Sequence, residues 1–351
     1  MDRKLIIDSV EISDSSDCYV IAEIGHNHQG NLEKCKELFR SAKLAGANAV
    51  KLQKRDNRSL FTREMYESPY NSENAFGDTY GSHREFLEFG REEYEELQIY
   101  SQELGITFFA TPFDISSANF LKELHMPAYK IASGDLTNTP LIRHVARFGK
   151  PIIISTGGAE MADVIRAYKT AKEYNDQIAL LQCTAGYPPD WNEINLRVIE
   201  TYREAFQDAV IGLSTHDSGI AIGLVGYVLG ARILEKHFTL NRASKGTDHA
   251  FSLEKPGLQK IIRDLRRARE TLGDGVKVRY SSEEAPMFKM GKKLVVSRDL
   301  KSGHVLTEKD LLCKSPSDGL PPYEYVNLIG RTLKHDLKEN GNISFSDLVE
   351  R

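Results

Sequence analysis

The chain has 351 residues, more than one ordinary hydrophobic core fills, so its length predicts one large domain and one small domain. Its composition is that of a globular protein, with 40% hydrophobic and 27% charged residues, and no apolar run is long enough to cross a bilayer. The formal net charge of −4 argues against a broad nucleic-acid surface, which requires clustered Lys and Arg.

The N-terminus and the cysteines indicate a reducing cytoplasm. Residues 1–8 contain only a short apolar run and no small-residue cleavage site, so we expect no secretory signal. The cysteines lie far apart and lack CxxC spacing, which favours neither a zinc site nor a disulfide framework. They are Cys18, Cys35, Cys183 and Cys313.

From residue 19 to about residue 272 the chain repeats one unit, in which a β-rich apolar run and a polar or glycine-containing turn precede a helical stretch. We expect strands at residues 19–24, 49–53, 107–110, 128–131, 151–155, 178–182, 210–214 and 233–237. Eight strands that alternate with helices close a (β/α)8 barrel. The sequence therefore predicts this fold for residues 1–272.

Two connecting segments between the strands are informative. Residues 32–45 place Leu38, Ala42 and Ala45 on one helical face, as expected of a helix in the outer ring. Residues 55–90 are too long for an ordinary loop and contain several aromatic side chains. We expect a functional lid there, and a disordered insert is the alternative.

The last quarter of the chain differs from the barrel repeat. After a helix over residues 256–272, residues 273–287 contain glycines and a Ser-Ser-Glu-Glu run, and they are predicted to be a linker. Residues 288–351 form a small β-rich module, too short to be a strong independent fold without a partner surface.

The reactive groups of such a barrel lie where its strands end, because the following loops form the open concave face. Lys51 and Lys130 lie in otherwise apolar strands, where an unpaired ammonium is costly to bury. One interpretation pairs them internally with Glu23 or Glu235. In the other interpretation, the two lysines and several strand-end hydroxyls bind the phosphate and the carboxylate of a substrate. The hydroxyls are those of Ser133, Ser155 and Ser214.

His216 and His237 end consecutive predicted strands, and neighbouring strands lie about 4.8 Å apart, so the two imidazoles can converge on one cation. Two histidines without cysteine leave positions open for water and substrate oxygens. This favours Mn²⁺, with Mg²⁺ or Co²⁺ as alternatives, over structural zinc.

Glu23 ends the first barrel strand, and a glycine-containing loop follows it. Close to a metal and two lysines, its carboxylate could carry a proton or position a hydroxyl. A salt bridge to Lys51 is an equal alternative at this point.

At these same positions the sequence resembles the sialic acid synthase family, and the resemblance runs along nearly the whole chain. The first half contributes Ala22-Glu23-Ile24-Gly25, Lys51-Leu52-Gln53, Thr111-Pro112-Phe113-Asp114 and Lys130-Ile131-Ala132-Ser133-Gly134-Asp135. The second half contributes Ile154-Ser155-Thr156-Gly157, Cys183-Thr184 with Tyr187-Pro188, Ser214 with His216, Glu235-Lys236-His237-Phe238-Thr239 and Lys245-Gly246-Thr247-Asp248-His249.

This resemblance implies a (β/α)8 barrel followed by a small β-rich antifreeze-like (SAF) domain, and a homodimer whose swapped SAF domain caps the partner's site. It also implies residue roles: Glu23 is catalytic, and His216 and His237 are catalytic and hold the metal. The remaining positions are implied to bind substrate: Lys51, Gln53, Thr111, Lys130, Ser133, Asp135, Ser155, Thr184, Tyr187, Ser214 and Asp248.

The implied reaction joins phosphoenolpyruvate to the open-chain aldehyde of an amino sugar and releases phosphate. The sugar stays open between N-acetylmannosamine, its 6-phosphate, mannose 6-phosphate and a diacetamido relative. Two other hypotheses remain. One is a seven- or eight-carbon keto-acid phosphate synthase, which usually lacks the C-terminal module, and the other is a non-catalytic carbohydrate- or ice-binding protein.

Overall fold

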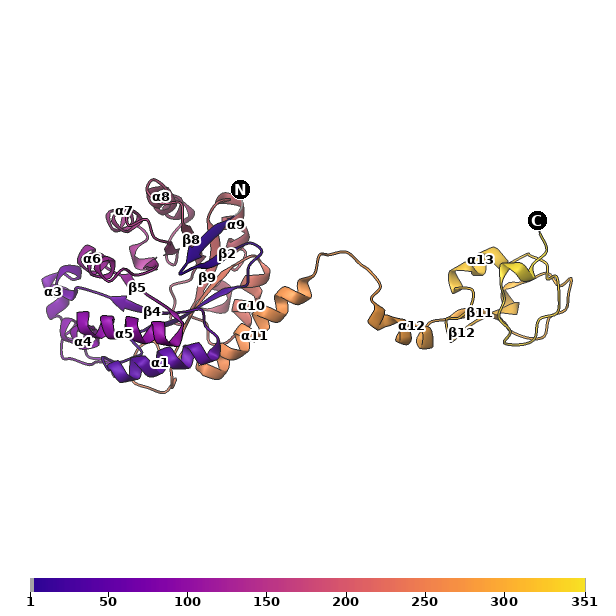
Figure 1. Cartoon of the computed structure of the whole chain (residues 1–351), viewed down its shortest axis with the longest axis horizontal. Helices are drawn as coiled ribbons and strands as arrows, with labels where there is room; N and C mark the ends of the chain where they lie inside the picture. Colours follow the sequence, from indigo (N-terminus) through magenta and orange to yellow (C-terminus); the bar gives the residue numbers. More distant parts are fainter. Residues whose placement is uncertain (1–2, 351) are drawn as a thin grey trace. The chain divides into compact units, whose positions relative to one another are not determined.

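The computed structural model describes residues 3–350, and the chain forms two compact units, Met1–Gly273 and Asp274–Arg351 (Figure 1). Each unit has its own cluster of buried apolar side chains. None of the helices in residues 3–350 combines the length and the apolar character needed to cross a membrane.

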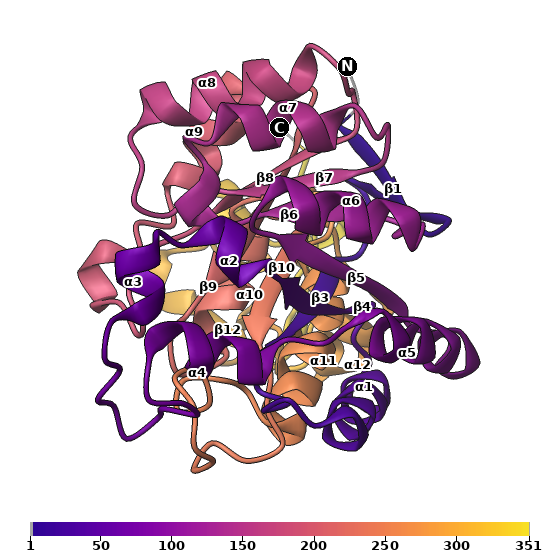
Figure 2. The same ribbon diagram turned by 90° about the vertical axis from the view of Figure 1, so that its left-hand side faces the viewer.

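The larger unit contains the predicted (β/α)8 barrel, a closed cylinder of eight parallel strands (Figure 2). In barrel order they are β10 (Ile233–His237), β3 (Tyr19–Gly25), β4 (Ala49–Lys54), β5 (Thr107–Pro112), β6 (Tyr129–Ile131), β7 (Ile152–Ser155), β8 (Ile178–Gln182) and β9 (Val210–Thr215). All eight predicted strands are confirmed to within about two residues at each end. Their side chains are almost entirely buried, as expected for parallel strands covered by helices.

Helices on the outside of the barrel connect these strands. They are α1 (Leu32–Ala45), α5 (Arg91–Leu104), α6 (Ile115–Glu123), α7 (Thr139–Ala146), α8 (Met161–Lys172), α9 (Val198–Ala205), α10 (Ala221–Val228) and α11 (Lys255–Leu272). Helix α1 has the predicted bounds, because the Asn31 side chain accepts a hydrogen bond from the Lys34 amide at its start and Gly46 ends it with a φ of 96°. Its buried face includes the predicted Leu38, Ala42 and Ala45.

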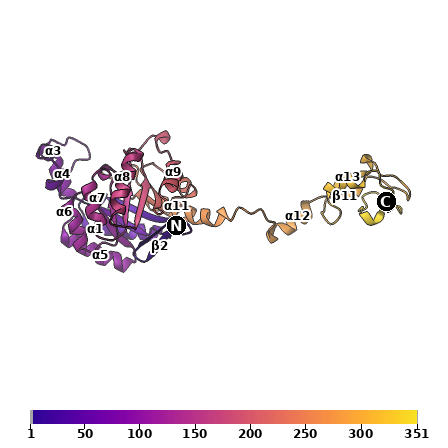
Figure 3. The same ribbon diagram turned by 90° about the horizontal axis from the view of Figure 1, so that it is seen from above.

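A hairpin of β1 (Lys4–Ile7) and β2 (Val10–Ser13) precedes the barrel and was not predicted. Leu5, Ile7 and Ile12 are buried, whereas Ile6 and Val10 are exposed, so the strands follow the two-residue period over only four residues each. Such a short run carries little signal. The hairpin lies at the end of the barrel opposite α3 (Arg63–Glu67) and α4 (Tyr80–Leu87) (Figure 1, Figure 3).

The long connection 55–90 is folded, so the alternative of a disordered insert is wrong. It contains α2 (Asn57–Leu60), α3 and α4, and an antiparallel bridge joins Pro69 to Thr79. Its aromatic side chains pack on one another: the rings of Tyr70, Tyr80 and His83 are mutual neighbours, with centroids 4.6 to 6.3 Å apart, and Phe76 stacks on Phe86. This packing supplies the segment with a small core of its own.

The smaller unit contains α12 (Glu284–Met290), the antiparallel pair β11 (Lys293–Val296) and β12 (Leu311–Lys314), and α13 (Tyr325–Leu328). Its core includes Leu294, Val296, Leu306, Leu328 and Ile343. It is the small β-rich module that the sequence predicts. The segment 273–287, predicted to be a linker, contains a 3₁₀ turn at Ser281–Glu283 and becomes α-helical at residue 284, where α12 begins.

Candidate functional site

A cavity of about 590 Å³ lies where the barrel strands end. Twelve of the fourteen predicted site residues line it: Glu23, Lys51, Gln53, Thr111, Lys130, Ser133, Ser155, Tyr187, Ser214, His216, His237 and Asp248. They come from all parts of the barrel sequence, because every strand delivers its carboxyl end to this face.

The strand register explains why the charged groups meet. Glu23 of β3 is paired in register with Lys51 of β4 on one side and with His237 of β10 on the other. Glu235 and His237 are two residues apart on β10, so both side chains point to the same face of the strand. The alternation of a β-strand therefore turns these groups toward the cavity.

Two buried ion pairs connect the lysines to the glutamates. Lys51 Nζ lies 2.7 Å from Glu23 Oε2, and Lys130 Nζ donates a hydrogen bond of 2.9 Å to Glu235 Oε1. Lys51 also lies 3.7 Å from Glu235 and donates to the Thr111 hydroxyl at 2.8 Å. The internal pairing that the sequence left as an alternative is thus present. It involves one oxygen of each carboxylate, and Glu235 Oε2 is buried without a hydrogen-bond partner.

The two glutamates have opposite pKa shifts. Burial raises the pKa of Glu23 by more than Lys51 lowers it. Burial acts on Glu235 as well, but Lys130 and Lys51 together outweigh it and hold the pKa of that carboxyl below its usual value. Of the two, Glu23 is therefore the carboxyl that takes up a proton more readily, and Glu235 is the one held as an anion.

His216 and His237 face each other with ring centroids 5.3 Å apart, and Phe251 contacts both rings. His216 Nδ1 lies 3.1 Å from the carbonyl oxygen of Thr184, which can only accept, so this nitrogen carries the hydrogen. Burial and the neighbouring His237 lower the pKa of His216 to about 4, and burial also lowers that of His237. Both imidazoles are neutral at pH 7, with a lone pair available on each ring.

Tyr187 and Asp248 flank the two imidazoles. The Tyr187 ring lies 4.1 Å from the His216 ring, centroid to centroid, and Asp248 Oδ2 lies 3.7 Å from His237 Nδ1, which is buried without a hydrogen-bond partner. An aromatic ring beside a carboxylate suits the apolar and hydroxyl faces of a carbohydrate.

Two predicted site residues do not line the cavity. Thr184 donates its hydroxyl to the Glu193 carbonyl at 2.9 Å, so its contribution is the backbone carbonyl that orients His216. Asp135 lies in a short 3₁₀ turn after β6 and accepts a hydrogen bond of 3.0 Å from the Asn138 side chain. In both cases the side chain is hydrogen-bonded to a residue outside the lining of the cavity.

Several lining residues were not among the predicted site residues: His26, Arg55, Arg84, Phe113, Ala132, Gly134, Cys183, Ala185, Glu235 and Thr247. Glu235 was considered as an ion-pair partner only. Arg55 follows Gln53 by two residues, and this period could have indicated it. Arg84 carries no such signal, because it lies on α4 within the long connection.

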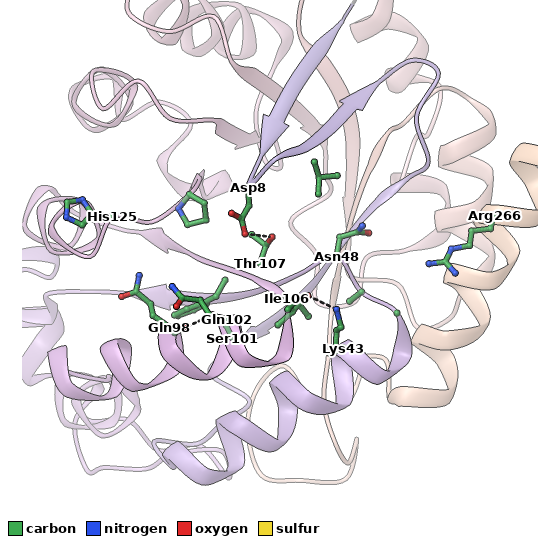
Figure 4. Close-up of a pocket in the computed structure, with 16 residues that line it drawn as sticks. Asp8, Lys43, Asn48, Gln98, Ser101, Gln102, Ile106, Thr107, His125 and Arg266 are labelled. Carbon is green, nitrogen blue, oxygen red and sulfur yellow. Dashed lines mark hydrogen bonds between the residues drawn. The ribbon is translucent and has the colours of Figure 1, made fainter.

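A second cavity, of about 730 Å³, lies at the other end of the barrel and includes Asp8 of the hairpin and Thr107 at the start of β5 (Figure 4). Its polar groups do not converge. Thr107 donates to Asp8 at 3.1 Å, Lys43 donates to the Gly105 carbonyl at 2.5 Å, and Arg266 lies on the side opposite His125. The cavity at the carboxyl ends of the strands is therefore the candidate active site, although it is the smaller one.

Comparison with known families assigns both units of the chain. The model of the NeuB family matches residues 38–277, which hold most of the barrel. The chain belongs to the NeuB family. The SAF domain matches residues 293–349, within the smaller unit, so this NeuB-family chain has a barrel followed by a SAF domain.

Curated and solved relatives resemble the chain over most of its length. The N-acetylneuraminate-9-phosphate synthase of Homo sapiens is 39% identical over 334 residues, 95% of this chain and 93% of the human protein. The N,N'-diacetyllegionaminic acid synthase of Campylobacter jejuni is 34% identical, over 92% of this chain and 97% of its own. The crystal structure of the N-acetylneuraminic acid (sialic acid) synthetase of Leptospira borgpetersenii, in complex with citrate, matches with a TM-score of 0.69 at 33% identity, covering 82% of this chain and 95% of its own.

Proposed function

We propose that this NeuB-family chain is a sialic acid (nonulosonate) synthase. It condenses phosphoenolpyruvate with N-acetylmannosamine or its 6-phosphate, giving N-acetylneuraminate or its 9-phosphate and inorganic phosphate. The observation that carries the proposal is the meeting of Lys51, Lys130, Glu23 and two facing imidazoles at the carboxyl ends of the strands. The names of the human and Leptospira relatives support the same reaction.

The two lysines are assigned to phosphoenolpyruvate. Its phosphate and carboxylate are anions, and Lys51 and Lys130 are buried cations. Lys51 donates to the Thr111 hydroxyl, and Ser155 and Ser214 line the same cavity. An anion that attracts Lys51 also weakens the ion pair between Lys51 and Glu23. Since burial already raises the pKa of Glu23, substrate binding would favour its protonated form.

The reaction balances with one water and no redox step. A bond forms between C3 of phosphoenolpyruvate and the aldehyde carbon of the sugar, whose oxygen takes a proton and becomes a hydroxyl. Water adds at C2 of the former enol, and the bond from C2 to the phosphate oxygen then breaks, leaving an α-keto acid and phosphate. Glu23 is the group placed to move the protons, because its pKa is the one shifted toward neutral pH.

His216 and His237 are proposed to hold a divalent cation, with Mn²⁺ favoured over Mg²⁺ or Co²⁺. The residues fit a metal, since the Nδ1 hydrogen of His216 is directed to a backbone carbonyl, an orientation common to metal-binding histidines. When bound, the ion supplies Lewis-acid polarisation of the sugar carbonyl. Within residues 3–350 no three His, Cys, Asp or Glu side chains are grouped to hold one ion, so water and substrate would complete its coordination.

The test is phosphate release from phosphoenolpyruvate with a panel of sugars, after chelation and with Mn²⁺, Mg²⁺ or Co²⁺ restored. The panel contains N-acetylmannosamine, its 6-phosphate, mannose 6-phosphate and a diacetamido hexose. Turnover with an N-acetylmannosamine sugar that needs a restored cation is the expected result. Calorimetry with Mn²⁺ alone should show binding that is lost in His237→Ala, and equal Mn²⁺ affinity in that variant would contradict the metal assignment.

The same panel separates the remaining candidates. Preference for the diacetamido hexose or for mannose 6-phosphate would indicate a synthase of a related nonulosonate. A seven- or eight-carbon keto-acid phosphate synthase would instead use a four- or five-carbon aldose phosphate, and the SAF match over residues 293–349 argues against it. A non-catalytic carbohydrate-binding protein would release no phosphate with any sugar.

We further propose a cytoplasmic homodimer in which the SAF domain of one copy caps the site of the other. The family resemblance supports this assembly, and the widely spaced cysteines support the compartment. Light scattering in solution tests the dimer. Mixing inactive Glu23→Gln protein with a chain truncated after residue 273 tests the swap, since restored activity requires complementation between copies.

A further inference from the structure

Two arginines at the rim of the candidate site meet at one histidine. Arg55 follows β4, Arg84 lies on α4, and His26 follows β3. Arg55 Nη1 lies 3.1 Å from His26 Nε2, and Arg84 Nη1 lies 3.4 Å from His26 Nδ1. All three side chains line the candidate active site.

This contact leaves hydrogen-bond donors unsatisfied. Burial and both arginines hold the pKa of His26 well below its usual value, so the ring is neutral and only one of its nitrogens accepts. A guanidinium has donors alone, so one of the two arginines faces an N–H group. Arg84 Nε is in addition buried without a hydrogen-bond partner.

The surrounding carboxylates do not neutralise the pair. Glu88 approaches Arg55 only to 3.8 Å, while it lies 3.3 Å from Lys54 and accepts the backbone N–H of Arg55. Within residues 3–350 no carboxylate oxygen lies within 4 Å of the Arg84 guanidinium. Burial, followed by repulsion from Arg84, lowers the pKa of Arg55 to about 10. An added anion would relieve this repulsion.

Asp248 links this rim to the imidazoles. Its Oδ2 lies 3.7 Å from His237 Nδ1. Burial raises the pKa of Asp248, but His237, Thr247, His26 and Arg84 together outweigh burial, so the net shift is downward. Gly25, which has no side chain, leaves space beside Gln53, Glu23 and Asp248. A Cβ at this position would lie 3.2 Å from Gln53 Nε2 and from Glu23 Oε1, and 3.7 Å from Asp248 Oδ2.

From this geometry we propose that Arg55 and Arg84 form a subsite for the terminal phosphate of the sugar, so that the acceptor is a hexosamine 6-phosphate. Two guanidinium groups present the paired donors that a phosphate dianion accepts. The aldehyde end then lies at His216 and His237, and the chain of the sugar passes Asp248. This assignment rests on the proposed function, and it separates the sugar phosphate from the phosphoenolpyruvate anion at the lysines.

The test compares Arg84→Gln with Arg63→Gln, a matched control on α3 whose side chain is 88% exposed in the same connection. For each protein, kcat/KM is measured with N-acetylmannosamine 6-phosphate and with N-acetylmannosamine, together with the KM for phosphoenolpyruvate. We expect the ratio of the two kcat/KM values to fall at least about 10-fold in Arg84→Gln, as for loss of a charge-assisted hydrogen bond, and to stay unchanged in Arg63→Gln. An unchanged ratio, or a rise confined to the KM for phosphoenolpyruvate, would overturn the subsite.

A binding measurement separates this inference from the proposed function. Calorimetry with mannitol 6-phosphate, which has no aldehyde and cannot react, should show binding to the unsubstituted protein and at least about 10-fold weaker binding to Arg84→Gln. Absence of binding to the unsubstituted protein would refute the subsite even if the sugars turn over. Binding that depends on Arg84, with no turnover of any sugar, would refute the proposed reaction and leave the subsite standing.

Discussion

Both units bury charged groups, but the two units differ in how many of the hydrogen bonds of these groups are made within the protein. In the SAF unit, Asp310 is fully buried, and each of its oxygens has hydrogen-bond partners. Arg298 donates to Oδ1 at 2.9 Å, while His304 lies 2.9 Å from Oδ2 and the Thr307 hydroxyl donates to Oδ2 at 2.7 Å. In the barrel, Glu235 Oε2, His237 Nδ1 and Arg84 Nε are buried without a partner.

The difference separates a structural charge from a functional one. A buried polar group without a partner costs about 1 to 3 kcal/mol, so a fold that needs only stability completes its hydrogen bonds, as Asp310 does. Unsatisfied groups that converge on one cavity indicate that a ligand supplies the missing partners. Substitutions in the two regions should therefore act on different quantities: turnover in the barrel, and the free energy of unfolding in the SAF unit.

The largest effect is expected at Glu23. Glu23→Gln keeps the shape of the side chain and its contact with Gln53, but it removes the carboxyl that we propose to exchange a proton. We expect kcat to fall about 10³-fold, within the range for loss of a general acid or base. The measurement is phosphate release at saturating substrates.

The stability of the same variant provides the contrast. Burial raises the pKa of Glu23 above its unfolded value, so its ionisation opposes folding as the pH rises, and Glu23→Gln removes this cost. The same change leaves the buried Lys51 with the more distant Glu235, at 3.7 Å, which opposes that gain. The free energy of unfolding in urea at pH 8 should therefore change little. A large loss of stability with unchanged kcat would make Glu23 a structural residue like Asp310.

Removal of a whole ion pair should have the next largest effect. In the double variant Lys130→Met with Glu235→Gln, kcat/KM for phosphoenolpyruvate should fall at least about 10²-fold, because an anchoring cation is lost. The free energy of unfolding should change by less than about 1 kcal/mol or increase, since the pair no longer has to be desolvated.

The single variant Lys130→Met is the control for that pair. It leaves Glu235 with the more distant Lys51, at 3.7 Å, and the Ser214 hydroxyl, at 3.4 Å. It should be destabilised by about 3 kcal/mol relative to the double variant. If the double variant retained full activity, the Lys130–Glu235 pair would contribute to stability and not to turnover.

The smallest effect is expected in the SAF unit. Asp310→Asn replaces one accepting oxygen by a donor, which then faces the donors of Arg298, or of Thr307 and His304, and should destabilise this unit by about 2 kcal/mol. Hydrogen–deuterium exchange of residues 293–349 in the full chain measures the loss, and the barrel peptides serve as the internal reference. Unchanged protection would show that Asp310 does not stabilise the SAF unit.

The pH dependence of this unit gives a second check. Burial would raise the pKa of Asp310, but hydrogen bonds from His304, Thr307 and Arg298 outweigh it and hold that pKa well below its usual value. The stabilisation is therefore complete above the unfolded pKa of about 4 and is lost as the pH falls below it. Protection of residues 293–349 should decrease from pH 5 to pH 3, and Asp310→Asn should show a smaller decrease.

Much of the fold could be predicted because the barrel repeats a strong local pattern. Each strand is an apolar run bounded by polar turns, and the bounds of α1 follow from Asn31 and Gly46, which act within a few residues. Hairpin β1–β2 was missed for the opposite reason, since four residues per strand carry too little periodicity.

The sequence by itself determined the eight strands, the outer helices, the position of the SAF unit and the strand-end groups from Glu23 to His237, because period and burial are local properties. Only the tertiary structure decided that Lys51 pairs with Glu23 and Lys130 with Glu235, and that Thr184 acts through its carbonyl. It also brought Arg84 against His26, 58 residues earlier in the chain. Such contacts depend on barrel closure and on the fold of a long connection, and no spacing along the chain encodes them.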